Sequence, residues 1–146
     1  MTLSERQYAR RSWPLLSALR TALRTEHNVH FALLFGSAAR GTDTPASDVD
    51  VLVGLRDPSL DRVVELGAKL TEVTGRRVDV VRLEDAQAEP SLLADVVADG
   101  RVLVDREGVW SGLRGREASL LREGRRTDAR RTRAALVGLD RMLADR

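Results

Sequence analysis

The chain has 146 residues, of which 42% are apolar and 32% charged, and its net charge is +2. These values predict one soluble globular domain with a single core, and the small net charge argues against nucleic-acid binding by the molecule as a whole. Cysteine is absent, which excludes disulfides, and no run of 18 apolar residues or apolar segment near the N-terminus occurs. A cytoplasmic protein is therefore expected.

The first part of the chain predicts a helix, a strand and a short second helix. Ser12 followed by Pro14 is typical of a helix start, and leucines then recur at helical spacing to about Glu26. A buried strand is expected at Val29–Phe35. The short helix is expected at Ser37–Arg40, directly after a Gly-Ser turn.

The rest of the chain alternates between strand and helix patterns. The expected elements are a loop at 42–47, strands at 48–53, 78–83 and 101–104, helices at 58–73 and 90–98, and two final helices at about 109–123 and 128–144. This order predicts an α/β or α+β fold with a helical tail. Residues 1–106 are expected to form the core, and residues 107–146 a helical extension of the same domain.

The arginine-rich C-terminal region and the two tryptophans lead to further expectations. The region from residue 113 to the end holds ten arginines against five acidic residues, which is most simply a solvated helix face and, as an alternative, a partner or nucleic-acid surface. The two tryptophans, Trp13 and Trp110, are expected to pack in the core or between helices.

An acidic pair opens the second strand. Asp48 and Asp50 alternate with valines, so both carboxylates point to one face of the strand, a few ångströms apart. Like charges held this close raise each other's pKa unless cations lie between them. Oxygen ligands without histidine or cysteine favour Mg²⁺, or Mn²⁺, over zinc.

The Gly-Ser turn before this pair is suited to binding phosphate. Gly36 lets the backbone approach a phosphate closely, and Ser37 offers a hydroxyl at the start of a helix, where amide groups are free. Arg40 lies in the first turn of that helix and adds positive charge.

A third acid, Asp79, interrupts the apolar strand "RRVDVVRL". Three carboxylates can hold two metal ions about 4 Å apart, one activating an attacking hydroxyl and the other binding a triphosphate. Asp79 is placed to accept the proton of that hydroxyl as a general base. The alternative is a structural ion pair between Asp79 and Arg76, Arg77 or Arg82.

Together these residues resemble a known signature. Gly36-Ser37, ten residues, and then Asp48-Val49-Asp50 is similar to the motif of the nucleotidyltransferase superfamily with the DNA polymerase β-like fold. The longer run "FGSAARG…SDVDVLV" resembles its minimal nucleotidyltransferase branch, closely over about residues 29–83 and more loosely to about 104. The pattern is filled at Gly36, Ser37, Arg40, Gly41, Ser47, Asp48, Asp50 and Asp79.

The resemblance implies transfer of a nucleoside monophosphate from a nucleoside triphosphate with two Mg²⁺ ions. It assigns catalysis and metal binding to the three aspartates Asp48, Asp50 and Asp79. Nucleotide binding falls to Gly36, Ser37, Arg40 and Ser47. The residues themselves do not distinguish ATP from other triphosphates.

The resemblance also suggests a biological role. Small proteins of this branch are often paired with a HEPN-domain ribonuclease toxin, which they silence as antitoxins by moving AMP from ATP to a tyrosine. Such a toxin is the expected partner here. One alternative is an antitoxin that only binds its toxin and has a vestigial site. A second is an enzyme that transfers a nucleotide to a small molecule such as an aminoglycoside. A nucleic-acid polymerase is favoured less, given the small net charge.

Overall fold

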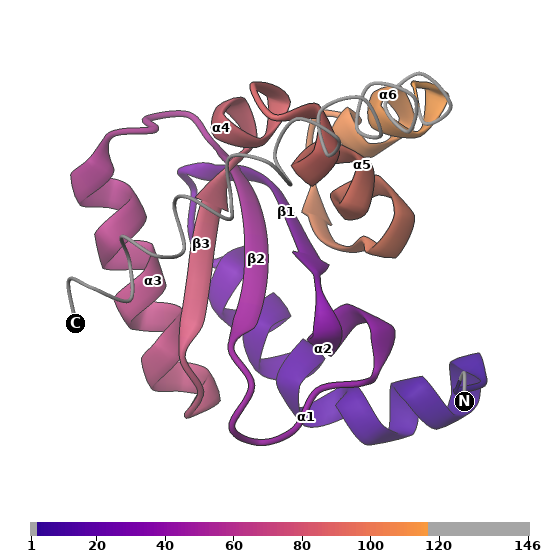
Figure 1. Cartoon of the computed structure of the whole chain (residues 1–146). Coiled ribbons are helices and arrows are strands. Elements are labelled where there is room, and N and C mark those ends of the chain that lie inside the picture. The colour runs from indigo at the N-terminus through magenta and orange to yellow at the C-terminus, as the bar shows by residue number, and fades with distance from the viewer. Residues whose placement is uncertain (1–2, 117–146) are drawn as a thin grey trace, which may run out of the picture.

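A four-stranded mixed sheet forms the centre of the computed structural model, which describes residues 3–116 (Figure 1). The strands are β1 (Val29–Phe35), β2 (Val49–Leu55), β3 (Val78–Arg82) and β4 (Arg101–Asp105). Their order is β3-β2-β1-β4, with β1 antiparallel to β2 and β4, and β2 parallel to β3. The end of β1 therefore meets the starts of β2 and β3 at one end of the sheet.

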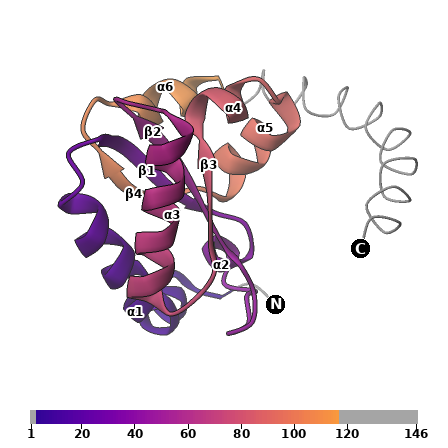
Figure 2. The ribbon, with the colours of Figure 1, turned by 90° about the vertical axis from the view of Figure 1, so that its left-hand side faces the viewer.

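Six helices in the described residues surround this sheet. They are α1 (Glu5–Arg24), α2 (Ser37–Arg40), α3 (Leu60–Thr74), α4 (Leu83–Gln87), α5 (Pro90–Asp99) and α6 (Val109–Gly115). Helices α1 and α3 contribute to the hydrophobic cluster on one face, and α4, α5 and α6 to the cluster on the other (Figure 2). The mixed architecture confirms the predicted α/β class.

Helix α1 begins earlier than the sequence pattern predicted. Ser4 is its N-cap: the Ser4 hydroxyl accepts from the Gln7 amide, and the Gln7 side chain accepts from the Ser4 amide. The predicted start at Ser12 and Pro14 is wrong, because Pro14 lies inside the helix. Pro14 is exposed, so the carbonyl that loses its partner one turn earlier can be hydrated.

Helix α4 was not predicted at all. Strand β3 ends at Arg82, whose guanidinium binds the Asp85 carboxylate in the first turn of α4, with Nε–Oδ2 2.8 Å. Five residues are too few to show helical periodicity, so Leu83 fitted the preceding strand equally well. Of the two predicted terminal helices, the first begins as expected at Val109, and the second, at 128–144, lies outside the described residues.

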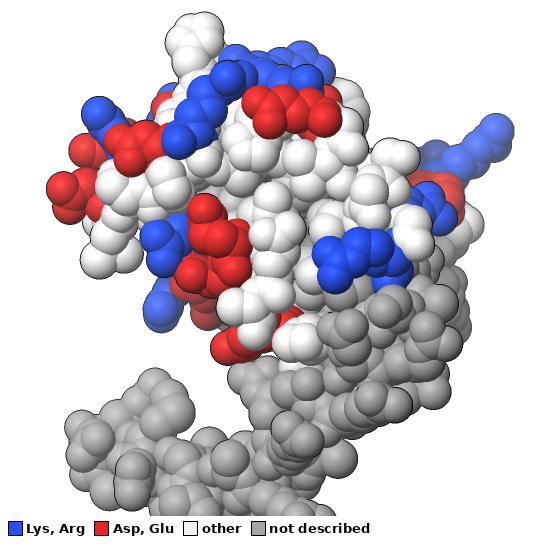
Figure 3. All heavy atoms as spheres, turned by 90° about the horizontal axis from the view of Figure 1, so that it is seen from above, with Lys and Arg blue, Asp and Glu red and all other residues white. Residues whose placement is uncertain are grey.

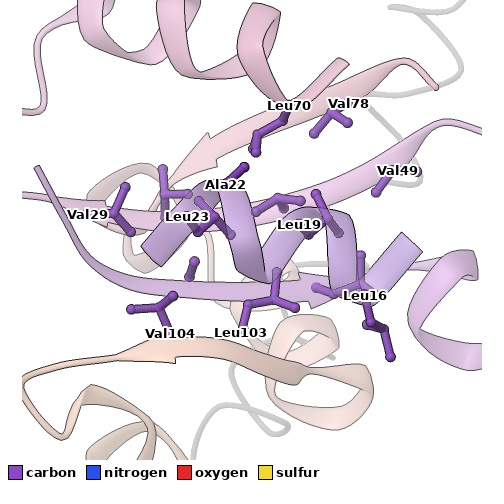
Figure 4. Close-up of a cluster of buried hydrophobic side chains, with 14 of the residues drawn as sticks. Leu16, Leu19, Ala22, Leu23, Val29, Val49, Leu70, Val78, Leu103 and Val104 are labelled. Carbon is purple, nitrogen blue, oxygen red and sulfur yellow. The ribbon is translucent and has the colours of Figure 1, made fainter. Parts of the chain in front are cut away.

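The core lies on both faces of the sheet. Leu19, Val51 and Leu70 are fully buried on the α1/α3 side, part of the cluster drawn in Figure 4. Leu52 and Leu93 are buried on the other side. Because β1 and β2 are covered on both faces, they read as nearly continuous apolar runs, and a charged residue within them stands out.

The two tryptophans differ in burial. Trp110 packs against the cluster on the α4–α6 side, as predicted. Trp13 is 60% exposed, so its predicted core position is wrong. It lies one position outside the buried stripe of α1 that runs through Ser12, Leu16 and Leu19, which turns its side chain away from the sheet. Within residues 3–116, no helix has the length and apolarity needed to cross a membrane.

Candidate active site

Gly36 ends β1 in a conformation that only glycine adopts easily. Its φ is 76° and its ψ −157°. A Cβ atom built at this position would overlap the Asp50 carboxylate at Oδ2. The Gly-Ser turn is therefore in direct contact with the second acid of the motif, and both the backbone angle and the close approach require glycine.

Helix α2 follows at the predicted residues and is supported by distant parts of the chain. The Tyr8 hydroxyl donates to the Ala38 carbonyl at 3.0 Å, and Arg101 Nε donates to the Ala39 carbonyl at 2.7 Å. The Arg101 guanidinium also stacks on the Tyr8 ring, 3.5 Å from its centroid. Neither residue belongs to the motif, and only the tertiary structure shows that α1 and β4 hold the turn in place.

The three predicted acids come together at the starts of β2 and β3. Asp50 and Asp79 are direct partners in the parallel register, and Asp48 lies just before β2. Burial raises the pKa of Asp50, and the negative charges of Asp79 and Asp48 raise it further, while Arg40 acts in the opposite direction. The three carboxylates thus form an acidic cluster whose charge is only partly compensated.

Asp79 is not consumed by a strong ion pair. Of the three arginines that the sequence offered as partners, Arg76 binds Asp43 and Arg82 binds Asp85. The third, Arg77, has its Nε 3.4 Å from Asp79 Oδ1, but its side chain is 75% exposed, and exposed pairs of this kind contribute little. The Asp79 side chain is itself 42% exposed and accessible to a ligand.

Two predicted nucleotide-binding residues have partners of their own. Arg40 Nη1 lies 2.7 Å from Asp99 Oδ2 at the end of α5, although the Arg40 side chain remains half exposed. Ser47 Oγ accepts a hydrogen bond from the Thr44 amide at 2.9 Å, which closes the turn before Asp48. Arg40 is thus near the acids, while Ser47 shapes the loop that leads to them.

The donor set fits a hard divalent cation. The clustered acids supply only oxygen atoms, and residues 3–116 contain no group of three histidine, cysteine, aspartate or glutamate side chains arranged to hold a metal by themselves. Oxygen donors suit Mg²⁺ better than zinc, and Mg²⁺ retains water and is commonly completed by substrate phosphates. The raised pKa of Asp50 reflects charge that such a cation would neutralise.

The acids lie outside the two main cavities found in the described part of the chain. One cavity, of about 490 Å³, lies between α1, the 42–47 loop and the end of α3. The other, of about 340 Å³, includes Leu55 and Lys69 at the opposite end of the sheet. Neither is lined by Asp48, Asp50 or Asp79.

The family described as Polymerase beta, Nucleotidyltransferase matches residues 18–108, which is more than half of the chain. A relative from Thermococcus cleftensis, named protein adenylyltransferase MntA, is 40% identical over 68 residues; the match covers 46% of this chain and 69% of that protein.

Solved structures show the same fold. A chain from a toxin–antitoxin complex with AMP-PNP has a TM-score of 0.62 at 23% identity, covering 85% of this chain and 98% of its own. A chain from the complex of a tri-AMPylated Shewanella oneidensis HEPN toxin with an MNT antitoxin has a TM-score of 0.58 at 20% identity, covering 86% and 96%. The fold and the motif confirm the resemblance, and the chain belongs to the polymerase beta nucleotidyltransferase family, among its MntA-type members.

Proposed function

We propose that this chain is an antitoxin that transfers AMP from ATP to a HEPN-type ribonuclease toxin. The relative that shares 40% identity is named as a protein adenylyltransferase. Structures with the same fold come from toxin–antitoxin complexes, one with AMP-PNP and one with an AMPylated HEPN toxin.

The observation that carries this proposal is the contact between the Gly-Ser turn and the acidic cluster. Gly36 lies against the Asp50 carboxylate, and Asp50 is the register partner of Asp79. A triphosphate bound to the backbone of the turn would therefore lie beside the carboxylates. That juxtaposition is what nucleotidyl transfer needs: bound phosphate next to a cation site and a base.

The predicted residues take the following roles in this proposal, with Ser47 shaping the loop before Asp48. Gly36 and Ser37 bind phosphate, and Arg40 exchanges Asp99 for a phosphate oxygen. Asp48, Asp50 and Asp79 would hold two Mg²⁺ ions, or Mn²⁺, which supply charge neutralisation and lower the pKa of the attacking hydroxyl.

The reaction balances as a simple displacement at phosphorus. A tyrosine oxygen of the toxin forms a bond to the α-phosphorus of ATP, and the bond from that phosphorus to the bridging oxygen breaks. Pyrophosphate leaves, and Asp79 accepts the tyrosine proton. The product is a toxin tyrosine that carries AMP.

The experiment mixes the purified chain with ATP labelled on its α-phosphate and the protein product of the adjacent gene. The wild type is expected to label the toxin, and the Asp48→Ala, Asp50→Ala double variant is not. A matched control, Asp61→Ala with Glu72→Ala, removes two exposed acids from α3 and is expected to label normally. Equal labelling by wild type and the acid-site variant, or none by wild type, would contradict the proposal.

The same materials test the two alternatives. Neutralisation of the toxin by the acid-site double variant at normal dose would favour a binding-only antitoxin. If the wild-type chain makes the host resistant to an aminoglycoside and the acid-site double variant does not, a small-molecule acceptor would be favoured.

A further inference from the structure

The loop at 42–47 joins the two halves of the motif. It begins after α2, which carries the phosphate turn, and ends at Asp48, the first acid. The distance between turn and acids therefore depends on how firmly this loop is held. Its own hydrogen bonds all join Thr44 and Ser47: the Ser47 amide donates to the Thr44 carbonyl and the Thr44 amide to Ser47 Oγ, both at 2.9 Å, and the two hydroxyls lie 3.2 Å apart.

A carboxylate inside the loop anchors it from two sides. The Asp43 side chain is only 10% exposed. Its Oδ1 lies 3.0 Å from Arg11 Nη1 on α1, and its Oδ2 lies 2.8 Å from Arg76 Nη1. Arg11 also donates to the backbone carbonyls of Gly41 and Asp43. An acid this well covered needs both guanidinium groups to offset its lost hydration.

Arg76 connects this loop directly to the strand that carries the third acid. Its Nη2 donates to the Thr44 carbonyl at 3.0 Å and to the Ser47 carbonyl at 2.9 Å, so it spans both ends of the turn before Asp48. Arg76 itself lies just before β3. One guanidinium therefore ties the residue preceding Asp48 to the backbone that leads into Asp79.

We propose that Arg76, oriented by Asp43, is a positioning residue that sets Asp48 relative to Asp79 and so determines the affinity for Mg·ATP. The inference rests on the proposed function, because it assumes that these acids bind a cation with the nucleotide. Arginine is suited to the task since its planar fork donates to a carboxylate and two carbonyls at once. A lysine has a single ammonium and cannot hold all three acceptors in this geometry.

A matched control for Arg76 exists at the other end of the sheet. Arg106, like Arg76, makes three hydrogen bonds with one guanidinium, here to the backbone carbonyls of Arg24, Glu26 and Val29 at 2.9, 3.1 and 2.7 Å. It joins β4 to the end of α1 and the start of β1, away from the acids. Loss of either arginine removes three hydrogen bonds, one of them from a carboxylate in the case of Arg76, and of the two only Arg76 touches the loop that leads to Asp48.

The test measures Mg·ATP binding by titration calorimetry, with melting temperatures recorded for every protein. Both Arg76→Ala and Arg106→Ala are expected to lower the melting temperature, Arg76→Ala the more, because it also removes one partner of the covered Asp43 carboxylate. Only Arg76→Ala is expected to raise the dissociation constant for Mg·ATP, by at least tenfold, and to raise the Mg²⁺ concentration needed for half-saturation. Arg76→Lys is expected to fold and to show an intermediate defect, and it decides the outcome if Arg76→Ala fails to fold.

The outcomes separate this inference from the proposed function. If wild type binds Mg·ATP and the Arg76 variants bind it equally well, the positioning role is wrong and the proposed function stands. An equal loss of affinity in Arg106→Ala would also overturn the positioning role, because the effect would then follow from stability alone. If wild type does not bind Mg·ATP, both the inference and the proposed function fail.

Discussion

The two ends of the sheet differ in how their charged and polar groups are paired. At the end where β1 begins, called the matched end below, several polar groups are paired: Arg106 donates to three carbonyls, and Asn28 exchanges two hydrogen bonds with the backbone of Asp57, although the buried His30 Nδ1 makes no hydrogen bond. Seen from that side, acidic and basic side chains are interspersed (Figure 3). At the other end, Asp50 is half buried beside two further acids and its pKa is raised.

This difference indicates what each end contributes. The matched end stabilises the fold, because its arginine and asparagine side chains satisfy backbone carbonyls and amides that would otherwise lose a partner. The acidic end lowers stability in the absence of a cation, because like charges are held together next to the core. A protein that keeps such an arrangement at one end and avoids it at the other has a use for the unsatisfied charge, and the following changes test that.

The largest effect is expected at Gly36. Gly36→Ala forces a Cβ into the Asp50 carboxylate as well as a positive φ onto alanine, so AMP transfer is expected to fall by about two orders of magnitude or more, since misplacement of reacting groups on an ångström scale costs that much. Gly75→Ala is the control: its φ is +69° and a Cβ there meets nothing within 4 Å. It should cost about 1–2 kcal/mol of stability and leave transfer intact. Equal activities of the two variants would refute the role of the close approach.

Arg106→Ala should give the reverse pattern at the matched end. The variant leaves three carbonyls without their donor, and because they are partly hydrated we expect a loss of about 1 kcal/mol in the free energy of unfolding. Transfer activity per folded molecule is expected to be unchanged. Chemical denaturation and the labelling assay measure the two quantities, and a selective loss of activity would show that the ends are not independent.

Asp50→Asn should stabilise the protein, but only at neutral pH. The pKa of Asp50 is raised in the folded state, first by burial and then by Asp79 and Asp48. In wild type, Asp50 costs the folded state nothing at pH values below the pKa of an unfolded aspartate, where the side chain is protonated in both states. The free energy of unfolding then falls as the pH rises through the raised pKa of the folded state. The melting temperature of Asp50→Asn should exceed that of wild type at pH 7, and the gap should close as the pH falls below about 4.

Magnesium provides a second check on the same substitution. If the cation neutralises the acidic cluster, added Mg²⁺ with ATP should raise the melting temperature of wild type more than that of Asp50→Asn. Removal of the metal with EDTA should restore the difference. A constant gap at every pH and metal concentration would mean that the substitution acts through packing rather than charge.

The smallest effect is expected from Asp99→Asn. The ion pair of Asp99 with Arg40 is half exposed on the arginine side, so its loss should change stability by less than about 1 kcal/mol. Arg40 would then be free for phosphate, and Mg·ATP affinity should improve by up to about fivefold, the equivalent of that same energy. Weaker binding would show that Asp99 orients Arg40 instead of competing for it.

The acidic cluster could be predicted because its residues are either close together in the sequence or unusual for the strand in which they lie. Gly36 and Asp50 lie within one short segment, and Asp79 is an acid in an otherwise apolar strand. The sequence also contained the start of α1, as the Ser4 and Gln7 capping box, but the Ser-Pro pattern further on obscured it. The catalytic roles of these residues remain predictions, although the register places Asp50 beside Asp79.

The supporting contacts could not be predicted in the same way. Arg76 reaches a loop that lies about thirty residues earlier in the chain, and Arg101 reaches helix α2 across sixty. With 23 arginines in the chain, no pattern of spacing distinguishes the ones that hold backbone carbonyls from the ones that are solvated. Such pairings depend on tertiary structure, which brings distant segments together.

The register between β2 and β3 links the chemistry of the acids to the packing of the core. Side chains alternate along a strand, so Asp79 points away from the face on which Val78 and Val80 meet α1 and α3. A slip of β3 by one residue would turn Asp79 to that buried face and bring a valine to the edge that now holds the carboxylates. Substitutions in the interior of this protein can therefore abolish activity without touching any acidic residue, simply by changing which valines fit beneath the helices.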